Sequence, residues 1–550
     1  MINSLLFIFF YFLCFYIGRG IVIIFEFLLK KKFLEYKIFE IPLYVFYPII
    51  YLFFVGNVVV ISNFFTKGIN IIVFIISTVP LVFNLFQKRD WNKQFNIMSF
   101  TTLFILGLSS NTITFHQDAA SYHLSHQQFI RTEKIVLGMA NLHVRYGFSS
   151  MSEYVNSFFW LNNNFLIVHF VNLIFISTFY LFFIWIICNS KNFYYRLTTL
   201  TICLYGILDN FGIEGGKNGY FDIDSIGKQD GAFAILFFFS NFFIIKQIIS
   251  PEQYRNENLL FILLFVTFAI QYRIFGFLSL VGVSIIVFQN LKKINFKVFL
   301  FPLILGIIWT FKNYLTTSCL IFPVAISCLP SLWSDKYLAI SQNEELRFFH
   351  KAFNIKSESL FDWYFKWSDR YLNYYISINL LISFLLIILF IHIFFKFSKK
   401  NNTVKLLTFL YVLFLLLAWM LSAPSIRFGS GIFVLLVCSY SLFFSDLRFS
   451  KLDKFFNQKP MLLFLIFLTV ISTPLFDNYK NVKSNIEPKK IEPMYLIYEK
   501  NLNNWGEQVK NIDGQDVEFC WINKNCIPPN NNRIEEFDKF SYRVMKVVDK

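Results

Sequence analysis

Long apolar runs separated by short polar segments cover most of the chain. A helix needs about 20 apolar residues to cross the hydrocarbon core of a bilayer. Roughly 14 runs approach this length, so the pattern predicts an all-α polytopic membrane protein. The runs lie at about residues 2–29, 41–65, 69–87, 97–114, 161–188, 197–212, 231–249, 258–272, 274–290, 298–314, 375–397, 405–422, 430–446 and 461–477.

The composition supports this fold class. Hydrophobic residues make up 56% of the 550 residues and charged residues only 15%, whereas soluble domains carry roughly 25% charged residues. In a soluble protein the formal net charge of +16 would suit a nucleic-acid-binding surface. Here the basic residues fall mainly in short loops between apolar runs, so we expect a lipid bilayer and no nucleic acid as partner.

The basic loops also predict which segments share a face of the membrane. Short loops rich in Lys and Arg face the cytoplasm. Alternate loops of this chain carry Lys30, Lys31, Lys32, Lys88, Arg89, Lys191, Arg196, Lys246, Arg255, Lys292, Lys293, Lys399, Lys400, Arg448, Lys451 and Lys454. Both termini and every long polar segment are then expected on the outer face, namely 115–160, 213–230, 315–374, 423–429 and 478–550.

The cysteines divide in the same way. Those in apolar runs are expected as small core residues; they are Cys14, Cys188, Cys203 and Cys438. Those in the predicted outer segments are Cys319, Cys328, Cys520 and Cys526. In an oxidising compartment the pairs Cys319–Cys328 and Cys520–Cys526 are candidate disulfides, although spacing alone leaves the connectivity open.

A polar stretch from Phe115 to Ser150 interrupts the apolar pattern. It holds the histidines His116, His123, His126 and His143. Near its start, the Asp118 carboxylate could accept a proton from a hydroxyl or hold a divalent cation such as Mg²⁺ or Mn²⁺, or it could cap the helix that follows. His123 and His126 share a helix face, where they could ligate a metal or lie at the membrane interface beside Tyr122.

The second half of this stretch carries candidate phosphate ligands. His143 and Arg145 could bind a phosphate, because the guanidinium fork matches two phosphate oxygens. The alternative is an Arg145 held by lipid headgroups or by an ion pair with Glu133 or Glu153.

Two later polar segments add candidate groups. Where the segment 213–230 meets the next apolar run, Lys228 could bind a phosphate and Asp230 a metal or an acceptor. The lysines of this segment do not complete the GxxxxGK[ST] pattern, which disfavours a P-loop ATPase. Arg427 is a lone charge between two apolar runs, and such a charge is usually paired or functional. Its expected partner is a carboxylate or the phosphate of a lipid.

Two blocks of the polar stretch are Asp118–His123 and Asn141–Phe148, of which the second is the more specific. They resemble the D-x-x-x-Y-H and N-L-H-x-R-x-G-F blocks found in the first large outer loop of a family of large bacterial membrane proteins of the GT-C glycosyltransferase class. Further matches follow in order at Ser225–Asp230, Ser318–Pro323 with Trp333, Pro424–Gly429, and Cys520–Trp521 with Cys526 and Pro528. The resemblance covers about residues 115 to 530, and many members of the family are uncharacterised.

The resemblance implies a GT-C-like helical bundle in the bacterial cytoplasmic membrane, with its active face outward. It divides the chain into additional N-terminal spans (1–96), a core with outer loops (97–477) and a small C-terminal outer segment (478–550). GT-C enzymes bind a polyprenyl-phosphate sugar from the outer leaflet. Asp118 would be the base or a metal ligand; it has no D-x-D partner, and about three more spans precede it than is usual in the class. The residues near the donor phosphate or the acceptor would be Lys228, Asp230, Arg427, His143, Arg145, His123 and Tyr122.

The sequence therefore predicts a membrane glycosyltransferase. It would move a sugar from a polyprenyl-phosphate donor to a glycan, lipid or protein acceptor outside the cytoplasm. A polysaccharide polymerase or ligase with a lipid-diphosphate donor would use related chemistry. A transporter or flippase is a different class of alternative; transporters often show internal repeats, and no clear repeat is visible in this sequence.

Overall fold

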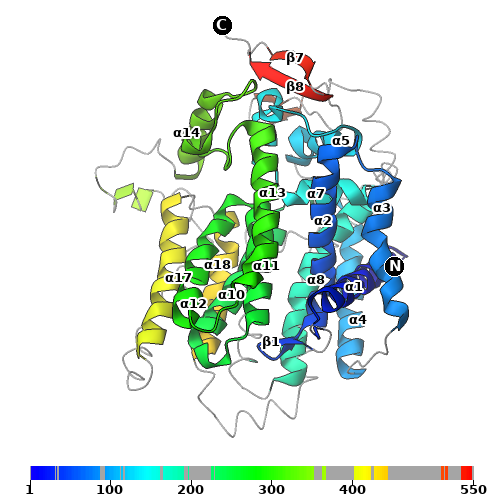
Figure 1. Ribbon diagram of the computed structural model, residues 1–550, viewed down its shortest axis with the longest axis vertical. Coiled ribbons are helices and arrows are strands. Elements are labelled where there is room, and N and C mark those ends of the chain that lie inside the picture. Colours follow the sequence, from blue (N-terminus) through cyan, green and yellow to red (C-terminus); the bar gives the residue numbers. More distant parts are fainter. Residues whose placement is uncertain are drawn as a thin grey trace.

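The computed structural model describes residues 2–30, 32–33, 36–86, 93–111, 113–115, 118–160, 165–190, 196, 225–227, 229–351, 359, 362–363, 365–366, 402–422, 426–443, 510–512, 515–517, 534–539 and 541–547. The described part is mostly helical, and its long helices run side by side (Figure 1).

The helices and strands have the following bounds. The α-helices are α1 (Ile2–Leu29), α2 (Tyr47–Phe65), α3 (Ile71–Thr78), α4 (Lys93–Leu108), α5 (Leu124–Thr132), α6 (Met139–Leu142), α7 (Met151–Phe159), α8 (Leu166–Asn189), α10 (Asp230–Ile249), α11 (Asn256–Tyr272), α12 (Ser279–Asn290), α13 (Leu300–Thr317), α14 (Lys336–Lys351), α17 (Asn402–Ser422) and α18 (Ile426–Phe443). Short helical turns are η1 (Leu43–Phe46), η2 (Val79–Phe86), η3 (Ser109–Asn111), η4 (Ala119–His123), η5 (Val144–Phe148), η6 (Pro251–Gln253), η7 (Ile274–Leu278), η8 (Phe296–Phe299) and η9 (Ala325–Ser327). The strands pair in twos as β1 (Lys37–Ile38) with β2 (Ile41–Pro42), β3 (Thr114–Phe115) with β4 (Ser225–Ile226), β5 (Lys510–Ile512) with β6 (Gln515–Val517), and β7 (Ile534–Lys539) with β8 (Tyr542–Val547).

The long helices have the length and composition of membrane spans. Among the described residues, six helical segments are long and apolar enough to cross a bilayer: Ile2–Leu28, Leu43–Phe65, Leu166–Asn189, Asp230–Ile249, Phe296–Thr317 and Thr403–Ser422. Shorter apolar helices lie at Ile71–Asn84, Ile97–Asn111, Asn256–Tyr272 and Ile274–Asn290. The structure thus agrees with an all-α membrane protein, and its described residues do not confirm the predicted number of about 14 spans. The runs at 197–212, 375–397 and 461–477 lie outside the described residues.

The centre of the bundle is built from phenylalanine. Phe46 in η1 is fully buried, and its ring centroid lies 5.1–6.3 Å from the centroids of rings on α8, α10 and α11. Helices α8 and α10 are almost entirely buried, whereas α13 and α17 leave many of their apolar side chains exposed. Exposed apolar helix faces of this length fit a hydrocarbon environment.

Two helix ends shape the region described below. Helix α13 ends at Thr317, and the capping residue Ser318 adopts the left-handed conformation (φ 63°) and donates its backbone N–H to Tyr314 O at 2.8 Å. Helix α11 ends at Tyr272, and the extended backbone of Arg273 separates it from η7. This break divides the long apolar stretch 258–290 into two helical parts and leaves a charged residue at the break.

The polar stretch folds into a layer at one end of the bundle. Its short helices η4, α5, α6, η5 and α7 lie at the end that also carries α14 and the hairpin β7–β8 (Figure 1). Strand β3 pairs in parallel with β4, with Phe115 opposite Ile226. This pairing brings the start of the polar stretch next to the segment that leads into α10.

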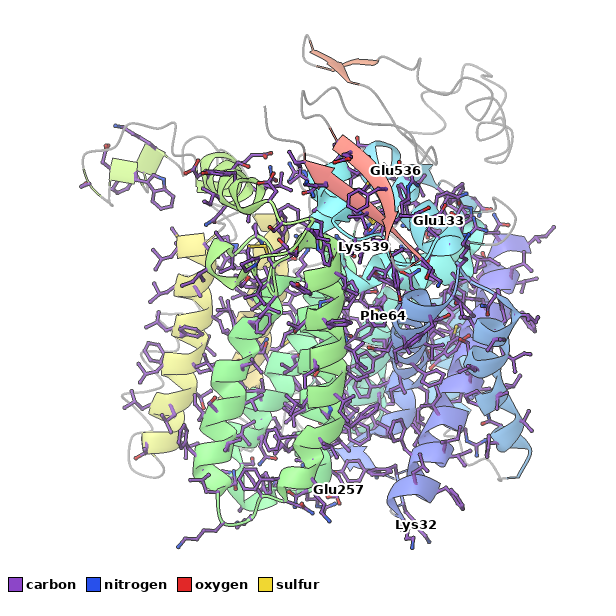
Figure 2. All side chains as sticks on the ribbon, turned by 45° about the horizontal axis from the view of Figure 1, so that its top comes forward. Lys32, Phe64, Glu133, Glu257, Glu536 and Lys539 are labelled. Atoms are coloured by element: carbon purple, nitrogen blue, oxygen red, sulfur yellow. A yellow bond between two sulfur atoms is a disulfide. The ribbon has the colours of Figure 1, made fainter. Side chains whose placement is uncertain are left out.

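The C-terminal hairpin is attached to this layer. Strand β8 extends its pairing to Leu137, which donates its N–H to Arg543 O and accepts from the N–H of Met545, both at 2.9 Å. The Tyr542 hydroxyl donates to Phe64 O at 2.7 Å. In Figure 2 Glu536 and Lys539 of the hairpin lie beside Glu133, at the end opposite to Lys32 and Glu257. The hairpin β7–β8 thus packs on the helical part of the chain.

Candidate functional site

A cavity of about 600 Å³ lies between the polar layer and the ends of α10, α11, α13 and α17. This volume is within the range of small-molecule sites. Its polar lining includes Asp118, Tyr122, His123, His126, Arg145, Glu153, Asp230, Gln271 and Arg273. Its apolar lining includes Phe148, Phe233, Ile270, Phe275, Phe277, Trp309, Leu320, Phe322 and Leu421. The cavity therefore combines ionisable groups with a large apolar surface.

Several residues singled out from the sequence meet at this cavity. They are Asp118, Tyr122, His123, Arg145 and Asp230. His143 does not line it: its ring packs against Tyr146, with centroids 5.0 Å apart, and its Nδ1 accepts the N–H of Arg145 at 3.1 Å. Lys228, His116 and the side chain of Arg427 lie outside the described residues.

Asp118 occupies the turn before η4. Its backbone is helical (φ −60°, ψ −30°), and its side chain makes no capping hydrogen bond to the following turn. The sequence-based alternative, a helix cap, is therefore not the role of this carboxylate. The element that it precedes is a π-helix, and such wide turns often occur at functional sites. The half-buried carboxylate lines the cavity instead.

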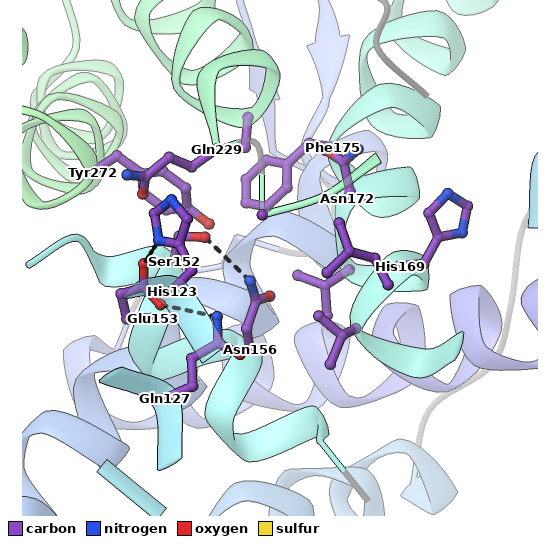
Figure 3. Close-up of a pocket in the computed structure, with 15 residues that line it drawn as sticks. His123, Gln127, Ser152, Glu153, Asn156, His169, Asn172, Phe175, Gln229 and Tyr272 are labelled. Carbon is purple, nitrogen blue, oxygen red and sulfur yellow. Dashed lines mark hydrogen bonds and ion pairs between the residues drawn. The ribbon is translucent and has the colours of Figure 1, made fainter. Parts of the chain in front are cut away.

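His123 and Glu153 form a buried pair at the wall of the cavity. His123 Nδ1 is hydrogen-bonded to Glu153 Oε1, and Gln127 Nε2 donates to Glu153 Oε2 at 2.9 Å. Figure 3 shows this pair, with Gln127 on the other side of the carboxylate. Glu153 is placed by α7, whose first turn is capped by the Ser150 hydroxyl. Both carboxylate oxygens are thus held by α5 and the end of η4.

Each member of the pair stabilises the charged form of the other. Burial lowers the pKa of the His123 imidazole, but the charge and hydrogen bond of Glu153 raise it more, so the pKa lies above its ordinary value. Burial raises the pKa of the Glu153 carboxyl, but the interactions with His123 lower it more, so that pKa lies below its ordinary value. The sequence suggested Glu153 only as one of several possible partners for Arg145, and in the structure Arg145 pairs with Glu345 instead.

The neighbouring histidines are of a different kind. His126 is buried and stacks on Tyr146 with ring centroids 5.0 Å apart. Burial lowers the pKa of His126 to about 4, and burial together with the charge of Arg145 lowers that of His143 to about 4. Both are therefore neutral at physiological pH. Within the described part of the chain, no group of three or more His, Cys, Asp or Glu side chains is placed to hold a metal ion.

Two arginines at the cavity are paired with carboxylates from other elements. Arg145 Nη2 lies 2.9 Å from Glu345 Oε1 of α14, and both side chains are about one-third exposed. Arg273 pairs with Asp230, the first residue of α10. Arg273 was missed as a site residue, although it is a lone charge between two apolar runs, the same signal that drew attention to Arg427.

Lys312 is a further charge that the sequence reading missed. It lies on α13, fully buried, with its Nζ 3.8 Å from the ring centroid of Trp309 and 5.5 Å from that of Tyr154. Among the described residues its Nζ has no hydrogen-bond partner. Glu153 is the acidic group whose charge acts on it.

The loop after α13 covers part of the cavity and contains a disulfide. Cys319 and Cys328 are bonded, which confirms the first predicted pair. Within this loop Phe322 contacts Phe148 of η5, with ring centroids 5.1 Å apart. The predicted pair Cys520–Cys526 lies outside the described residues.

Two of the cysteines expected in the core of apolar runs, Cys14 and Cys438, are buried, whereas Cys188 is half-buried. None of these three forms a disulfide. Cys203 lies outside the described residues.

Residues 1–434 match the family model described as "Domain of unknown function (DUF8201)". The chain belongs to this family. All of the described cavity residues lie within the matched range, whereas the hairpin β7–β8 follows it. No curated protein and no solved structure matches the chain.

Proposed function

We propose that this chain is a membrane glycosyltransferase that moves a sugar from a polyprenyl-phosphate donor to an acceptor hydroxyl of a glycan, lipid or protein. The observation that carries the proposal is the cavity itself. It joins the Asp118 carboxylate, two guanidinium groups and an apolar lining at one end of an apolar helical bundle. A donor with a phosphate, a sugar and an isoprenoid chain needs all of these surfaces.

The apolar lining suits the lipid part of such a donor. Phe275 and Phe277 of η7 line the cavity, and Phe277 is also exposed on the surface of the bundle. Leu421, at the end of α17, lines the cavity and is exposed as well. These side chains would let the first isoprene units enter from the bilayer beside α17 without leaving an apolar environment.

The arginines suit the phosphate. Arginine binds phosphate oxygens in pairs through its planar fork. Arg145 is the more accessible of the two, because its ion pair with Glu345 is partly exposed, whereas Asp230 is buried against Arg273. A phosphate would therefore replace Glu345 on Arg145 at a lower cost than it would replace Asp230 on Arg273.

The reaction would form a bond between the acceptor oxygen and the anomeric carbon while the bond from that carbon to the phosphate oxygen breaks. The lipid phosphate leaves with the bonding electrons, and the cationic groups of the cavity stabilise its charge. The acceptor hydroxyl loses its proton to a base. Asp118 is the carboxylate proposed to act on the acceptor, as base or as ligand of Mg²⁺ or Mn²⁺ together with Asp230.

The cavity end is proposed to face outward from the bacterial cytoplasmic membrane. The basic loop that contains Lys32 lies at the opposite end, which also carries Glu257 (Figure 2). The loop that contains Lys293 lies there too, because Asn256, next to Glu257, donates to Lys293 O. The Cys319–Cys328 disulfide closes a loop that lines the cavity. Both features fit the positive-inside rule and an oxidising outer compartment. A GT-C-like bundle with about 14 spans belongs to the same proposal.

The test uses purified full-length protein in liposomes with undecaprenyl-phosphate sugars, undecaprenyl-diphosphate sugars and envelope extract as acceptor source. We expect sugar transfer and release of lipid phosphate with the monophosphate donors. Asp118→Asn should abolish transfer without changing the melting temperature, while Asp538→Asn, on the exposed face of β7, should leave it unchanged.

The rival functions give different results. Transfer only from diphosphate donors would indicate a polymerase or ligase. Movement of the intact donor across the liposome membrane without transfer would indicate a flippase. Full activity of Asp118→Asn would refute the role of this carboxylate, and EDTA treatment followed by Mg²⁺ or Mn²⁺ addition would show whether that role needs a metal.

A further inference from the structure

We propose that His123, oriented by Glu153, is the base that takes the proton from the acceptor hydroxyl, and that Asp118 instead holds the acceptor or a cation. This inference rests on the proposed glycosyl transfer for the identity of the reaction. It rests on the cavity geometry for the assignment of the base. Nothing in the sequence patterns favoured His123 over Asp118 for this step.

The first observation is the fixed orientation of the imidazole. Glu153 accepts hydrogen bonds on both oxygens, one shared with His123 Nδ1 and one from Gln127 Nε2 at 2.9 Å. A carboxylate held on both sides cannot turn away from the imidazole. Because the carboxylate only accepts hydrogen bonds, the neutral imidazole must carry its proton on Nδ1. Its Nε2 is then the basic nitrogen.

The second observation is the position of that nitrogen. Both His123 and Glu153 line the large cavity. Within the described residues, His123 is hydrogen-bonded through Nδ1, and its ring packs on Tyr122 with centroids 4.3 Å apart. The side chain of His123 is 7% exposed and forms part of the cavity wall. It therefore has access to a molecule in the cavity.

A smaller pocket of about 30 Å³ adjoins the pair. It shares His123, Glu153 and Gln229 with the large cavity and adds the amides of Asn156 and Asn172 (Figure 3). This volume is large enough for one water molecule. The polar surroundings stabilise the charge that the pair gains when His123 takes up a proton.

The surrounding charges determine when His123 can act. The charged and titratable groups around it are Glu153 on α7, Asp118 before η4, Arg273 at the end of α11 and His126 on α5. Burial lowers the pKa of His123 and so does Arg273, but Glu153 and Asp118 raise it, and the pKa lies above its ordinary value. A base must be neutral to accept a proton, so transfer should increase as the pH rises through this pKa.

The proton balance is complete without another reactant. The acceptor O–H proton goes to His123 Nε2 as the acceptor oxygen bonds to the anomeric carbon and the lipid phosphate departs. The resulting imidazolium is stabilised by Glu153, and it returns its proton to the leaving phosphate or to solvent. Asp118, on the same lining, is placed to hold the acceptor.

The decisive variant is His123→Ala in full-length protein, assayed in liposomes with the monophosphate donors. General-base loss should lower kcat by about 10²–10⁴-fold. The space left beside the cavity should let added imidazole restore part of the activity, which a purely structural role would not allow. Phe129→Leu is the control, because Phe129 is a buried aromatic residue of α5 that lines neither the smaller pocket nor the large cavity, and imidazole should not change its activity.

Glu153→Gln tests the positioning role. Its amide would donate to Nδ1 and so shift the imidazole proton to Nε2, which should reduce kcat by about 10²-fold or more. Loss of the negative charge should also move the acid limb of the pH–rate profile to lower pH. Glu535→Gln on exposed β7 should leave both properties unchanged. A readout that does not need turnover is ¹⁵N NMR of the histidines at about pH 9, where wild type should show Nδ1–H for His123 and Glu153→Gln should show Nε2–H.

The outcomes separate the two proposals. Active wild type with an unchanged kcat in His123→Ala would overturn the base assignment and leave the glycosyltransferase intact. Loss of activity that imidazole does not restore, together with an unchanged pH profile in Glu153→Gln, would also overturn it. Wild type that transfers sugar from no lipid donor would overturn the proposed function, and with it the base, whatever the NMR spectra show.

Discussion

Replacing His126 by phenylalanine should make the protein less sensitive to acid. His126 is buried, and its ring stacks on Tyr146. Burial is the main reason that its pKa falls from the ordinary 6.5 to about 4, and the charges of Lys312 and His123 lower it further against the opposing effect of Glu153. Phenylalanine keeps an aromatic ring on Tyr146 but cannot take up a proton.

The size and the sign of the effect follow from this pKa. As the pH falls below 6.5, the unfolded chain binds a proton at His126, and the folded protein does not do so until about pH 4. The free energy of unfolding therefore decreases with falling pH across this window. One pKa unit corresponds to about 1.4 kcal/mol, so the loss between about pH 7.5 and about pH 5 is roughly 2 kcal/mol.

The assay is thermal unfolding of the purified full-length protein in detergent at these two pH values. The melting temperature of wild type should fall further on acidification than that of His126→Phe, whatever their difference at neutral pH. Phe129→Leu is a suitable control, because Phe129 contacts the same Tyr146 ring from the same helix without a titratable group. Relative to wild type, Phe129→Leu should lower the melting temperature by the same amount at both pH values. An equal acid-induced decrease in wild type and His126→Phe would refute the reasoning.

Two further predictions concern stability at other places in the polar layer and the bundle. Lys312→Met should raise the free energy of unfolding by about 1–3 kcal/mol. It removes a buried amino group that has no hydrogen-bond partner among the described residues, and it keeps the contact with Trp309. A lower melting temperature would contradict this. Asn141→Ala should cost about 1–3 kcal/mol by removing the bonds from Asn141 Nδ2 to Met545 O (2.8 Å) and Trp333 O (3.0 Å). Hydrogen exchange should then speed up in β8, and unchanged exchange there would count against the proposed anchoring.

Much of the architecture could be predicted from the local sequence. Apolar runs of about 20 residues predicted membrane helices, because a helix satisfies the hydrogen bonds of its own backbone within lipid. The long apolar helices of the described part follow these runs. The Cys319–Cys328 disulfide joins residues 9 positions apart, so proximity along the chain was sufficient to suggest it. The Phe115–Ser150 stretch was recognisable as the polar layer because ionisable residues are rare in an apolar chain.

The partners of the charged groups were decided only by the tertiary structure. Glu153 lies 30 residues from His123, Arg273 lies 43 residues from Asp230, and Glu345 lies 200 residues from Arg145. Each of these pairs joins two different elements, and the packing of α7, α11 and α14 against the layer determines which charges meet. A sequence can show that an isolated charge in an apolar chain needs a partner, but several carboxylates satisfy that need equally well until the helices are packed. For the same reason Asp118 was evident from the sequence, whereas the oriented imidazole beside it became visible only in the cavity.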